Sequence, residues 1–350
     1  MARRGHAVTL FATDADGAGG HLPMSAGREV HSEGWRARYF RSIGGPRWLR
    51  EFGASWAYAR ALRQSVPQSD IVHIYSLYNF SSWCGASQAR RANVPYVIEP
   101  HGSLDDFVFK HHPVRKRLYE VMFLRNKLQG ADAVRFLTEA EAVTARRNFR
   151  GELKSVIVPT GLDAHERPHT RAALRAYDRD ERHEEQLIVF VGRLHKKKGL
   201  DLLAKAFVEV ARRNPLAYLV IVGPDDGMQD EVDHILARGG VRSRVAFTGI
   251  LTGAPKVSLM ASARVVVVPS YDENFCNVVI EALALGVPVV LTDRVALYPQ
   301  VVAADAGIVV RANAGDLAQA LEVMLGDRAR AQMMGEAGAE LVKRSFTWKG

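Results

Sequence analysis

Short apolar runs alternate with stretches of helical periodicity along nearly the whole chain, and this alternation constrains the fold more than any other feature. In the first half, apolar runs at residues 7–13, 70–76, 95–102 and 131–138 are separated by helical patterns, among them helices predicted over residues 47–64 and 80–92. Strands that alternate with helices in this way form parallel sheets covered on both faces. The sequence therefore predicts an α/β protein with Rossmann-like architecture.

The alternation is interrupted once and then restarts. Residues 163–186 carry dense charge and little apolar content, which is typical of a linker or a surface excursion. Apolar runs then resume at residues 186–192, 264–270 and 307–310, again with helical patterns between them, the first of which predicts a helix over residues 200–213. Because 350 residues fit two domains, we predict an N-terminal Rossmann-like domain over residues 1–165 and a C-terminal one over residues 166–350.

Composition excludes several classes of protein. No apolar run approaches the roughly 18 residues of a membrane-spanning helix. The apolar stretch that follows the basic first residues is too short and too polar for a signal peptide. Cys84 and Cys276 are the only cysteines and lack metal-site spacing, so we expect a reducing, cytoplasmic setting. The formal net charge of +9 predicts an anionic partner: nucleic acid, anionic lipid or a phosphorylated substrate. The stretch GAGGH at residues 17–21 lacks dinucleotide-fingerprint spacing, which disfavours hydride transfer.

Two glutamates lie within a predicted strand, helix, strand unit. Glu273 falls in the turn after the apolar run at residues 264–270, and Glu281 lies early in a helix predicted over residues 277–285. Open α/β sheets bind ligands at the carboxyl ends of their strands, so we expect both carboxylates to flank one crevice. Glu281 either accepts hydrogen bonds from a vicinal diol such as a ribose or is a surface glutamate near a helix end. The pair also fits the acid and nucleophile of a glycosidase.

A basic loop opens the second domain in the stretch VGRLHKKKGLDLLAKAF (residues 191–207). Arg193 and Lys198 stand at the end of a predicted strand and just before a helix, which favours a diphosphate clamp. The alternative is a solvated charge run. This loop suits a phosphate leaving group better than the neutral alcohol that a glycosidase releases.

In the first domain, His101 and Gly102 directly follow the apolar run PYVIEP. A histidine at the end of a strand either hydrogen-bonds a ligand or polarises a reacting centre. The alternative is a structural role, in which His101 caps the next helix or satisfies buried carbonyls.

Four motifs occur in a recognisable order: His101-Gly102 after a strand, VPTGLD at residues 158–163, GRLHKKKG at residues 192–199, and the E-x7-E pair of Glu273 and Glu281. Together they resemble the family-four retaining glycosyltransferases of GT-B architecture. The resemblance covers nearly the whole chain. It implies two Rossmann-like domains whose parallel sheets face each other across a cleft, and transfer of a sugar with retention.

The resemblance implies a nucleotide-diphosphate sugar held mainly by the C-terminal domain. Arg193 and Lys198 would stabilise the departing diphosphate in place of a metal ion, so neither a metal nor a cofactor is expected. Glu281 would bind the ribose hydroxyls, and the base would lie near residues 248–250, which include Gly249.

The resemblance also implies how the sugar is held. Glu273 would bind its hydroxyls, and His101 would face it from the first domain. The backbone amides that would bind the sugar and the β-phosphate belong to Asn274, Phe275, Cys276 and Asn277.

The sequence departs from the family pattern in several places. The motif ARRGH, which in relatives follows a first strand, a glycine-rich loop and a helix, stands here at residues 2–6. We therefore expect an N-terminal domain whose sheet lacks its first strand, through a misplaced start or a truncation. The chain stops at SFTWKG, where relatives continue into a helix that crosses back. Thr160, Asn274 and Cys276 replace an asparagine and two glycines of the family.

Basic residues of the first domain indicate the acceptor side. Residues 28–63 hold eight arginines with Trp35, Trp48 and Trp56 among them, and a second basic cluster runs over residues 110–117. Such segments dock on anionic lipid headgroups, which predicts contact with the inner face of a membrane. The resemblance implies a glycan or lipid-linked acceptor. The alternative is a solvated surface with the tryptophans in the core. No nucleic-acid-binding motif is present, so nucleic acid is not expected.

The sequence thus predicts a glycosyltransferase of surface polysaccharide or glycolipid assembly. Two other interpretations stay open: a nucleotide-sugar epimerase or hydrolase of the same fold, and an inactive remnant that only binds nucleotide.

Overall fold

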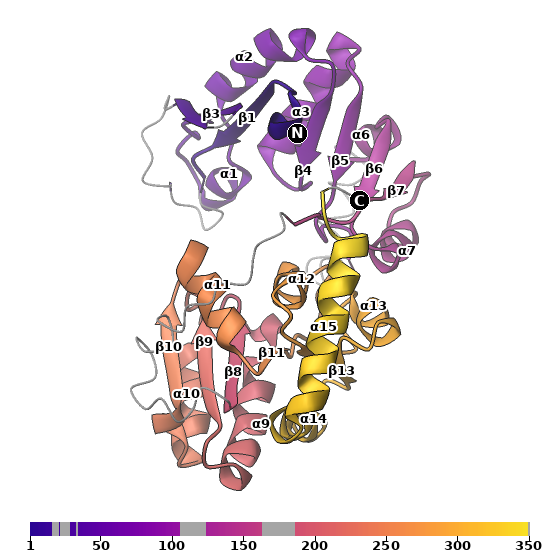
Figure 1. Ribbon diagram of the computed structural model, residues 1–350. Coiled ribbons are helices and arrows are strands. Elements are labelled where there is room, and N and C mark those ends of the chain that lie inside the picture. Colours follow the sequence, from indigo (N-terminus) through magenta and orange to yellow (C-terminus); the bar gives the residue numbers. More distant parts are fainter. Residues whose placement is uncertain (16–20, 22–28, 33, 106–123, 163–185, 349–350) are drawn as a thin grey trace. The chain divides into compact units, whose positions relative to one another are not determined.

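A computed structural model of the protein describes residues 1–15, 21, 29–32, 34–105, 124–162 and 186–348. The chain divides into two compact units, Met1–Val158 and Pro159–Gly350 (Figure 1). The boundary predicted after residue 165 lies outside the described residues, as do the basic cluster at residues 110–117 and nearly all of the charged segment.

Unit 1 contains two β-sheets. Three strands form the first, in the order β1 (Val8–Thr13), β3 (Trp35–Phe40), β2 (Glu29–Ser32), and four parallel strands form the second, in the order β4 (Val72–Tyr75), β5 (Tyr96–Glu99), β6 (Ala133–Phe136), β7 (Ser155–Ile157). Among the described residues no ladder joins β1 to β4. In the described part of unit 1, the parallel sheet expected from the sequence is therefore divided into two sheets.

Strand β2 corrects the prediction of purely parallel sheets, because it pairs antiparallel with β3. Its sequence, EVHS, has a single apolar residue, so the pattern of apolar runs did not predict this strand. Backbone hydrogen bonds to β3 hold this edge strand, and an edge strand needs no buried face of its own.

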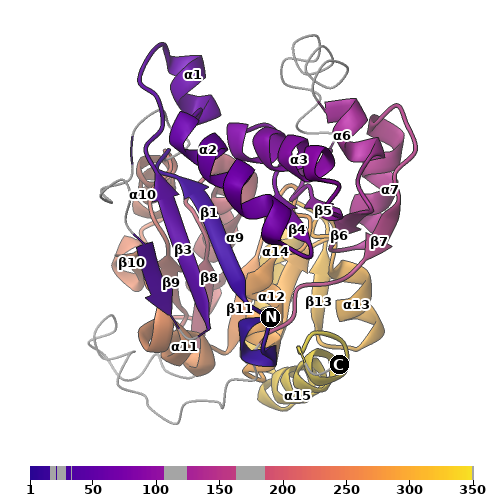
Figure 2. The same ribbon diagram turned by 90° about the horizontal axis from the view of Figure 1, so that it is seen from above.

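The helices of unit 1 join its two sheets over one hydrophobic core. Helix α2 (Trp56–Ser65) contacts β1, α3 (Phe80–Ala92) contacts β4, and the two helices contact each other (Figure 2). Their buried side chains share one cluster with residues of both sheets, such as Phe40 and Ile74. Among the described residues, the other helices of unit 1 are α1 (Arg47–Phe52), α6 (Arg125–Gln129), α7 (Glu139–Asn148) and two short 3-10 helices, Ala2–Arg4 and Val66–Gln68.

The helix predicted over residues 47–64 is two helices. Gly53 has a φ of 70°, in the left-handed region, and ends α1. Ser55 then begins α2 by accepting a hydrogen bond from the backbone N–H of Tyr58. Both are common helix-ending and helix-starting devices.

Unit 2 is built on one six-stranded parallel sheet. Its strand order is β10-β9-β8-β11-β12-β13, which is that of a doubly wound sheet whose order reverses between β8 and β11. The strands are β8 (Leu187–Val191), β9 (Tyr218–Val222), β10 (Val245–Gly249), β11 (Val265–Val268), β12 (Val289–Thr292) and β13 (Gly307–Val310). All four residues of β11 are valines and all are buried, as expected for a central strand with both faces covered.

Helices cover this sheet on both faces (Figure 1). They are α9 (Leu200–Arg213), α10 (Gln229–Arg238), α11 (Gly253–Ser262), α12 (Asn277–Ala284), α13 (Tyr298–Ala303), α14 (Ala314–Gly326) and α15 (Arg328–Ser345), together with the 3-10 helices Lys196–Lys198 and Arg242–Arg244. In α9, Leu203 and Phe207 are four residues apart and fully buried, and burial of each such side chain contributes about 1.5–3 kcal/mol. Helix α13 had not been predicted.

Candidate functional site

The point where the strand order of unit 2 reverses brings two predicted loops together. Strands β8 and β11 are hydrogen-bonded neighbours, although more than 70 residues separate them in the sequence. Each ends at the same edge of the sheet because the two run parallel. The loop after β8 carries Arg193 and Lys198, and the loop after β11 carries Glu273.

Gly199 fixes the contact between these loops. It has a φ of 68°, and a Cβ atom at this position would lie 1.9 Å from the carbonyl oxygen of Pro269, directly after β11. Only glycine permits such a close approach of two backbones. Beside it, the backbone N–H of Tyr271 donates to the carbonyl of Lys197 at 2.9 Å. The two loops therefore form one surface.

Ion pairs join the same two loops. Nζ of Lys198 contacts Oε2 of Glu273, and Nζ of Lys197 lies 3.0 Å from Oδ2 of Asp272. The side chains of Lys198 and Glu273 are 23% and 20% exposed, so both remain open to solvent. The structure thus brings together two residues that the sequence placed in separate motifs.

The backbone on either side of Glu273 pairs with a third loop. Its N–H donates to the carbonyl of Arg294 at 3.0 Å, and its carbonyl accepts from Ala296 at 2.8 Å. Both partners follow β12. The position of Glu273 is therefore set by the backbones of two neighbouring strand ends rather than by its own side chain.

The start of α12 presents the predicted backbone amides. Cys276 is the residue before the helix, with a φ of 56°, so a cysteine adopts the left-handed conformation that favours the glycine of the family. Burial raises the pKa of its thiol to about 12. Phe275 is buried against Phe346, with ring centroids 5.9 Å apart, so only its backbone can serve a ligand. Asn277 is exposed in the first turn of the helix.

Glu281, on α12, is held by a residue that sequence reasoning missed. Nζ of Lys256, on α11, donates to its two carboxylate oxygens at 3.0 and 2.9 Å. The two side chains are about a quarter exposed. Gly249, at the end of β10, has a φ of 67° and is exposed.

Arg193 also has a partner that the sequence did not indicate. Its Nη1 donates to Oδ2 of Asp226 at 2.7 Å. Asp226 belongs to the loop after β9, which the structure places beside the loop after β8. The signal available in the sequence was an acidic pair, Asp225 and Asp226, directly after an apolar run, which is the same signal that identified Glu273.

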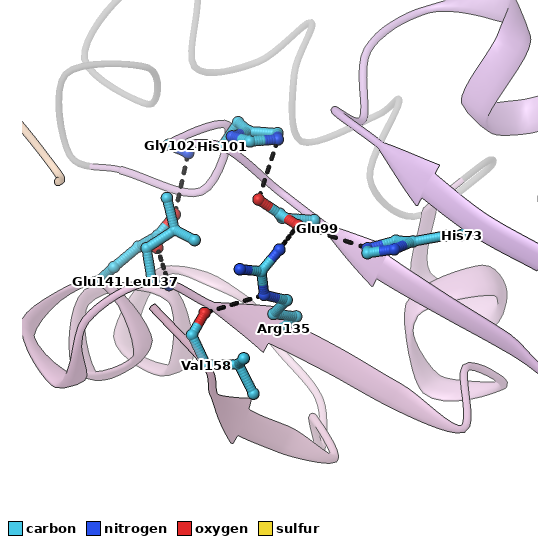
Figure 3. A network of polar contacts seen from close by, with 8 residues as sticks. All are labelled: His73, Glu99, His101, Gly102, Arg135, Leu137, Glu141 and Val158. Atoms are coloured by element: carbon cyan, nitrogen blue, oxygen red, sulfur yellow. Dashed lines mark hydrogen bonds and ion pairs between the residues drawn. The ribbon is translucent and has the colours of Figure 1, made fainter. Parts of the chain in front are cut away.

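In unit 1, His101 follows β5 and lies above a buried carboxylate (Figure 3). Nε2 of His101 lies 3.1 Å from Oε1 of Glu99, whose side chain is only 2% exposed. Nη1 of Arg135, on β6, donates to Oε2 of Glu99 at 2.5 Å. His101 itself has a φ of 48°, in the left-handed region. Residues 106–123, where the next helix would begin, lie outside the described residues, so a role of His101 as a helix cap stays a prediction.

Two family models match the chain almost end to end. The model for a glycosyl transferase 4-like domain matches residues 1–161, and the model for glycosyl transferases group 1 matches residues 177–341. The chain belongs to the family-four glycosyltransferases of GT-B architecture.

Several glycosyltransferases are similar to this one. A D-inositol 3-phosphate glycosyltransferase of Nocardia farcinica is 37% identical over 51% of this chain and 41% of its own length. The one of Segniliparus rotundus is 29% identical over 100% of this chain and 79% of its own length. The chain thus spans about two fifths of the first relative. Anabaena HepE, solved in complex with UDP-glucose, matches with a TM-score of 0.71 at 20% identity, over 89% of this chain and 82% of that one.

Across the described residues, no three histidine, cysteine, aspartate or glutamate side chains gather closely enough to hold a metal ion. Within the same part of the chain, no helix is both long and apolar enough to span a bilayer.

Proposed function

We propose that this protein is a retaining glycosyltransferase that moves a sugar from a nucleotide-diphosphate sugar to a glycan or lipid-linked acceptor, in surface polysaccharide or glycolipid assembly. One observation carries the proposal. At the reversal point of the unit 2 sheet, the cationic loop after β8 meets Glu273 and the first turn of α12. Doubly wound sheets bind their ligands at this point.

The chemistry of these groups fits a nucleotide-diphosphate sugar. Arg193 and Lys198 supply positive charge for a diphosphate, and a helix start such as that of α12 offers backbone N–H donors to an anion. Glu281 supplies acceptors for the two hydroxyls of a ribose. Stabilisation of the leaving diphosphate by fixed cations would make the reaction independent of a metal ion.

His101 would contact the transferred sugar from unit 1. Replacement by alanine is then expected to leave nucleotide binding unchanged and to lower the rate of transfer. A variant with the full rate of transfer would remove His101 from the set of catalytic residues.

The test incubates the protein with UDP-sugars, with and without an extract of lipid-linked and soluble glycans, and measures transfer of the sugar. Acceptor-dependent transfer that persists in EDTA, and a product with the anomeric configuration of the donor by NMR, would support it. Release or epimerisation of the sugar without any acceptor would instead identify a hydrolase or an epimerase. Binding of UDP without turnover under any condition would identify an inactive nucleotide-binding protein.

A phosphorylated polyol is a second acceptor class to include. The two curated relatives described above are named as D-inositol 3-phosphate glycosyltransferases. Transfer to D-inositol 3-phosphate in preference to lipid-linked glycans would move the protein from surface polysaccharide assembly to the glycosylation of a soluble phosphorylated acceptor.

A further inference from the structure

Three aromatic rings stack in unit 1 beside the buried carboxylate of Glu99. The ring of Tyr75 lies 4.5 Å from that of His73 and 5.5 Å from that of His101, centroid to centroid, and the planes are within about 22° of parallel. Glu99 reaches both histidines. Its Oε1 is 3.1 Å from Nε2 of His101, and its Oε2 is 3.4 Å from Nε2 of His73. The imidazole of His101 is therefore held on one face by Tyr75 and at one nitrogen by Glu99.

Arg135 is a fixed cation beside this carboxylate. Its Nη1 donates to Glu99, while its Nε donates to the carbonyl of Val158 at 2.9 Å, so the guanidinium is fixed at two points (Figure 3). Burial raises the pKa of Glu99, but the contacts with His73, Arg135 and His101 more than offset this and the pKa is lowered. An ionised carboxylate can only accept hydrogen bonds.

A second buried glutamate fixes the backbone next to His101. Oε1 of Glu141 accepts from the N–H of Gly102 at 3.0 Å, and Oε2 accepts from the N–H of Leu137 at 2.9 Å. Glu141 lies in the first turn of α7, and its own N–H donates to Thr138. The turn that carries His101 is thus tied to the start of a helix, independently of Glu99.

We propose that Glu99 is the positioning residue for His101: the carboxylate holds the imidazole with its proton on Nε2, and leaves Nδ1 as the nitrogen that meets the ligand. In the neutral ring Nδ1 is then a hydrogen-bond acceptor. It would accept from a hydroxyl group of the donor sugar or of the acceptor. The identity of this ligand rests on the proposed function, whereas the position of the proton does not.

The test is the tautomer of His101, read by NMR from the ring nitrogens of protein labelled with 15N-histidine. Spectra are recorded at pH 8, above the ordinary histidine pKa of about 6.5. A His101→Gln variant identifies the signals of His101 among those of the 12 histidines. Glu99→Gln then removes the charge that faces Nε2. Glu139→Gln, which changes an exposed glutamate of α7 paired with Arg146, is the matched control.

A second variant provides the test in case Glu99→Gln does not fold. Replacement of Glu99 alone removes an ion-pair partner of Arg135, whose side chain is only 13% exposed, and such a loss can destabilise a protein strongly. The double variant Glu99→Met/Arg135→Met removes both charges together and keeps the side-chain volume similar. Its tautomer pattern can be read even where Glu99→Gln does not fold.

The expected result is a proton on Nε2 of His101 in the wild-type protein and in Glu139→Gln, and a redistribution toward Nδ1 in both Glu99 variants. The kcat of sugar transfer is expected to fall by about tenfold or more in these variants, the scale of a displaced acid or base. The KM for the nucleotide sugar is expected to change by less than about twofold, because the groups proposed to bind its diphosphate and its ribose lie on unit 2.

Three outcomes would count against the inference. A proton on Nδ1 in the wild type, or an unchanged tautomer in both Glu99 variants, would overturn the role of Glu99. A changed tautomer with an unchanged kcat would overturn the role of Nδ1 toward the ligand. The tautomers of His101 could be as expected in the wild type and in the variants while the wild type neither binds UDP nor transfers sugar. This result would support the positioning by Glu99 and contradict the proposed function instead.

Discussion

Lys256 and Glu281 form a two-point contact between helices α11 and α12, with Nζ of the lysine 3.0 and 2.9 Å from the two carboxylate oxygens. A carboxylate has about four lone-pair sites, so Lys256 occupies two and leaves two for a diol. The lysine therefore orients the carboxylate without blocking it.

This arrangement predicts an order of effects on UDP binding, measured by calorimetry. Glu281→Ala should weaken binding by about tenfold or more, because an ionic hydrogen bond contributes roughly 1.5–3 kcal/mol. Lys256→Met should weaken it only about two- to fivefold. The double variant should bind no more weakly than Glu281→Ala alone, since the lysine acts through the glutamate. Additive losses would show that Lys256 contacts the nucleotide itself.

Lys198→Ala should lower the affinity for UDP by about tenfold or more, again the scale of one ionic hydrogen bond. The control is Lys196→Ala, because Lys196 lies in the same loop and its side chain is exposed. Equal losses in the two variants would mean that the loop acts only through its total charge. Unchanged affinity in Lys198→Ala and in Glu281→Ala together would remove the donor site from this position.

Asp226→Asn should strengthen UDP binding. In the unliganded protein Asp226 neutralises Arg193, and the two side chains are 41% and 66% exposed. An exposed ion pair contributes up to about 1 kcal/mol, so its removal should raise the affinity about two- to fivefold, with a smaller gain at high salt. Asp230→Asn, in the first turn of α10, is the control for loss of one negative charge nearby. Weaker binding in Asp226→Asn would contradict competition between Asp226 and the diphosphate.

The lowered pKa of Glu99 predicts a dependence of stability on pH. A carboxyl whose pKa is lower in the folded than in the unfolded protein stabilises the fold fully above the unfolded value, here 4.5, and this contribution is lost as the pH falls through the folded value. Urea unfolding at pH 7 and at several pH values below 4.5 should therefore show that the wild type loses more free energy of unfolding on acidification than Glu99→Gln does. Parallel curves for the two proteins would contradict the assigned direction.

Two exposed tryptophans predict contact with an anionic membrane. Trp48 and Trp56 are 58% and 78% exposed, which corrects the alternative that placed them in the core, and Arg50, Arg60 and Arg63 are exposed on the same two helices. The fraction of protein that sediments with vesicles containing phosphatidylserine should be about tenfold lower for Trp48→Ala/Trp56→Ala than for the wild type. For the wild type this fraction should decrease with added salt.

Met333→Ala changes an equally exposed apolar residue of unit 2 and should sediment with the vesicles like the wild type. A wild-type protein that stays in the supernatant at low salt would rule out the membrane contact. Arg28 and the cluster at residues 110–117 lie outside the described residues and play no part in this prediction.

Local sequence was sufficient to predict most of the fold. The spacing of apolar residues predicted α3, α9 and β13 with the bounds that they have in the structure. It missed β2, which has no apolar run, and α13, which is only six residues long. It also merged α1 and α2, because the break depends on one left-handed residue, Gly53, in an otherwise helical pattern.

The residues of the candidate site likewise fall into those that the sequence predicted and those that it missed. The strand and loop pattern selected Arg193, Lys198, Glu273 and Glu281, since each follows a strand or opens a helix. Their charged partners were missed. Lys256 lies inside helix α11 and carries no local signal, whereas Asp226 stands in an acidic pair after a strand, but nothing in the local sequence pairs it with Arg193. The sequence did not indicate a role for Glu99 either, because a carboxylate inside a strand usually points to solvent.

The sequence by itself determined that this chain forms two Rossmann-like units and which residue types stand at the ends of their strands, because periodicity and turn chemistry are local properties. Only the tertiary structure decided which of these charges face one another. The reversal of strand order between β8 and β11 brings Lys198 to Glu273, and the pairing of β5 with β6 brings Arg135 to Glu99. Such contacts join residues that are distant in the sequence, and they form only when the sheets assemble.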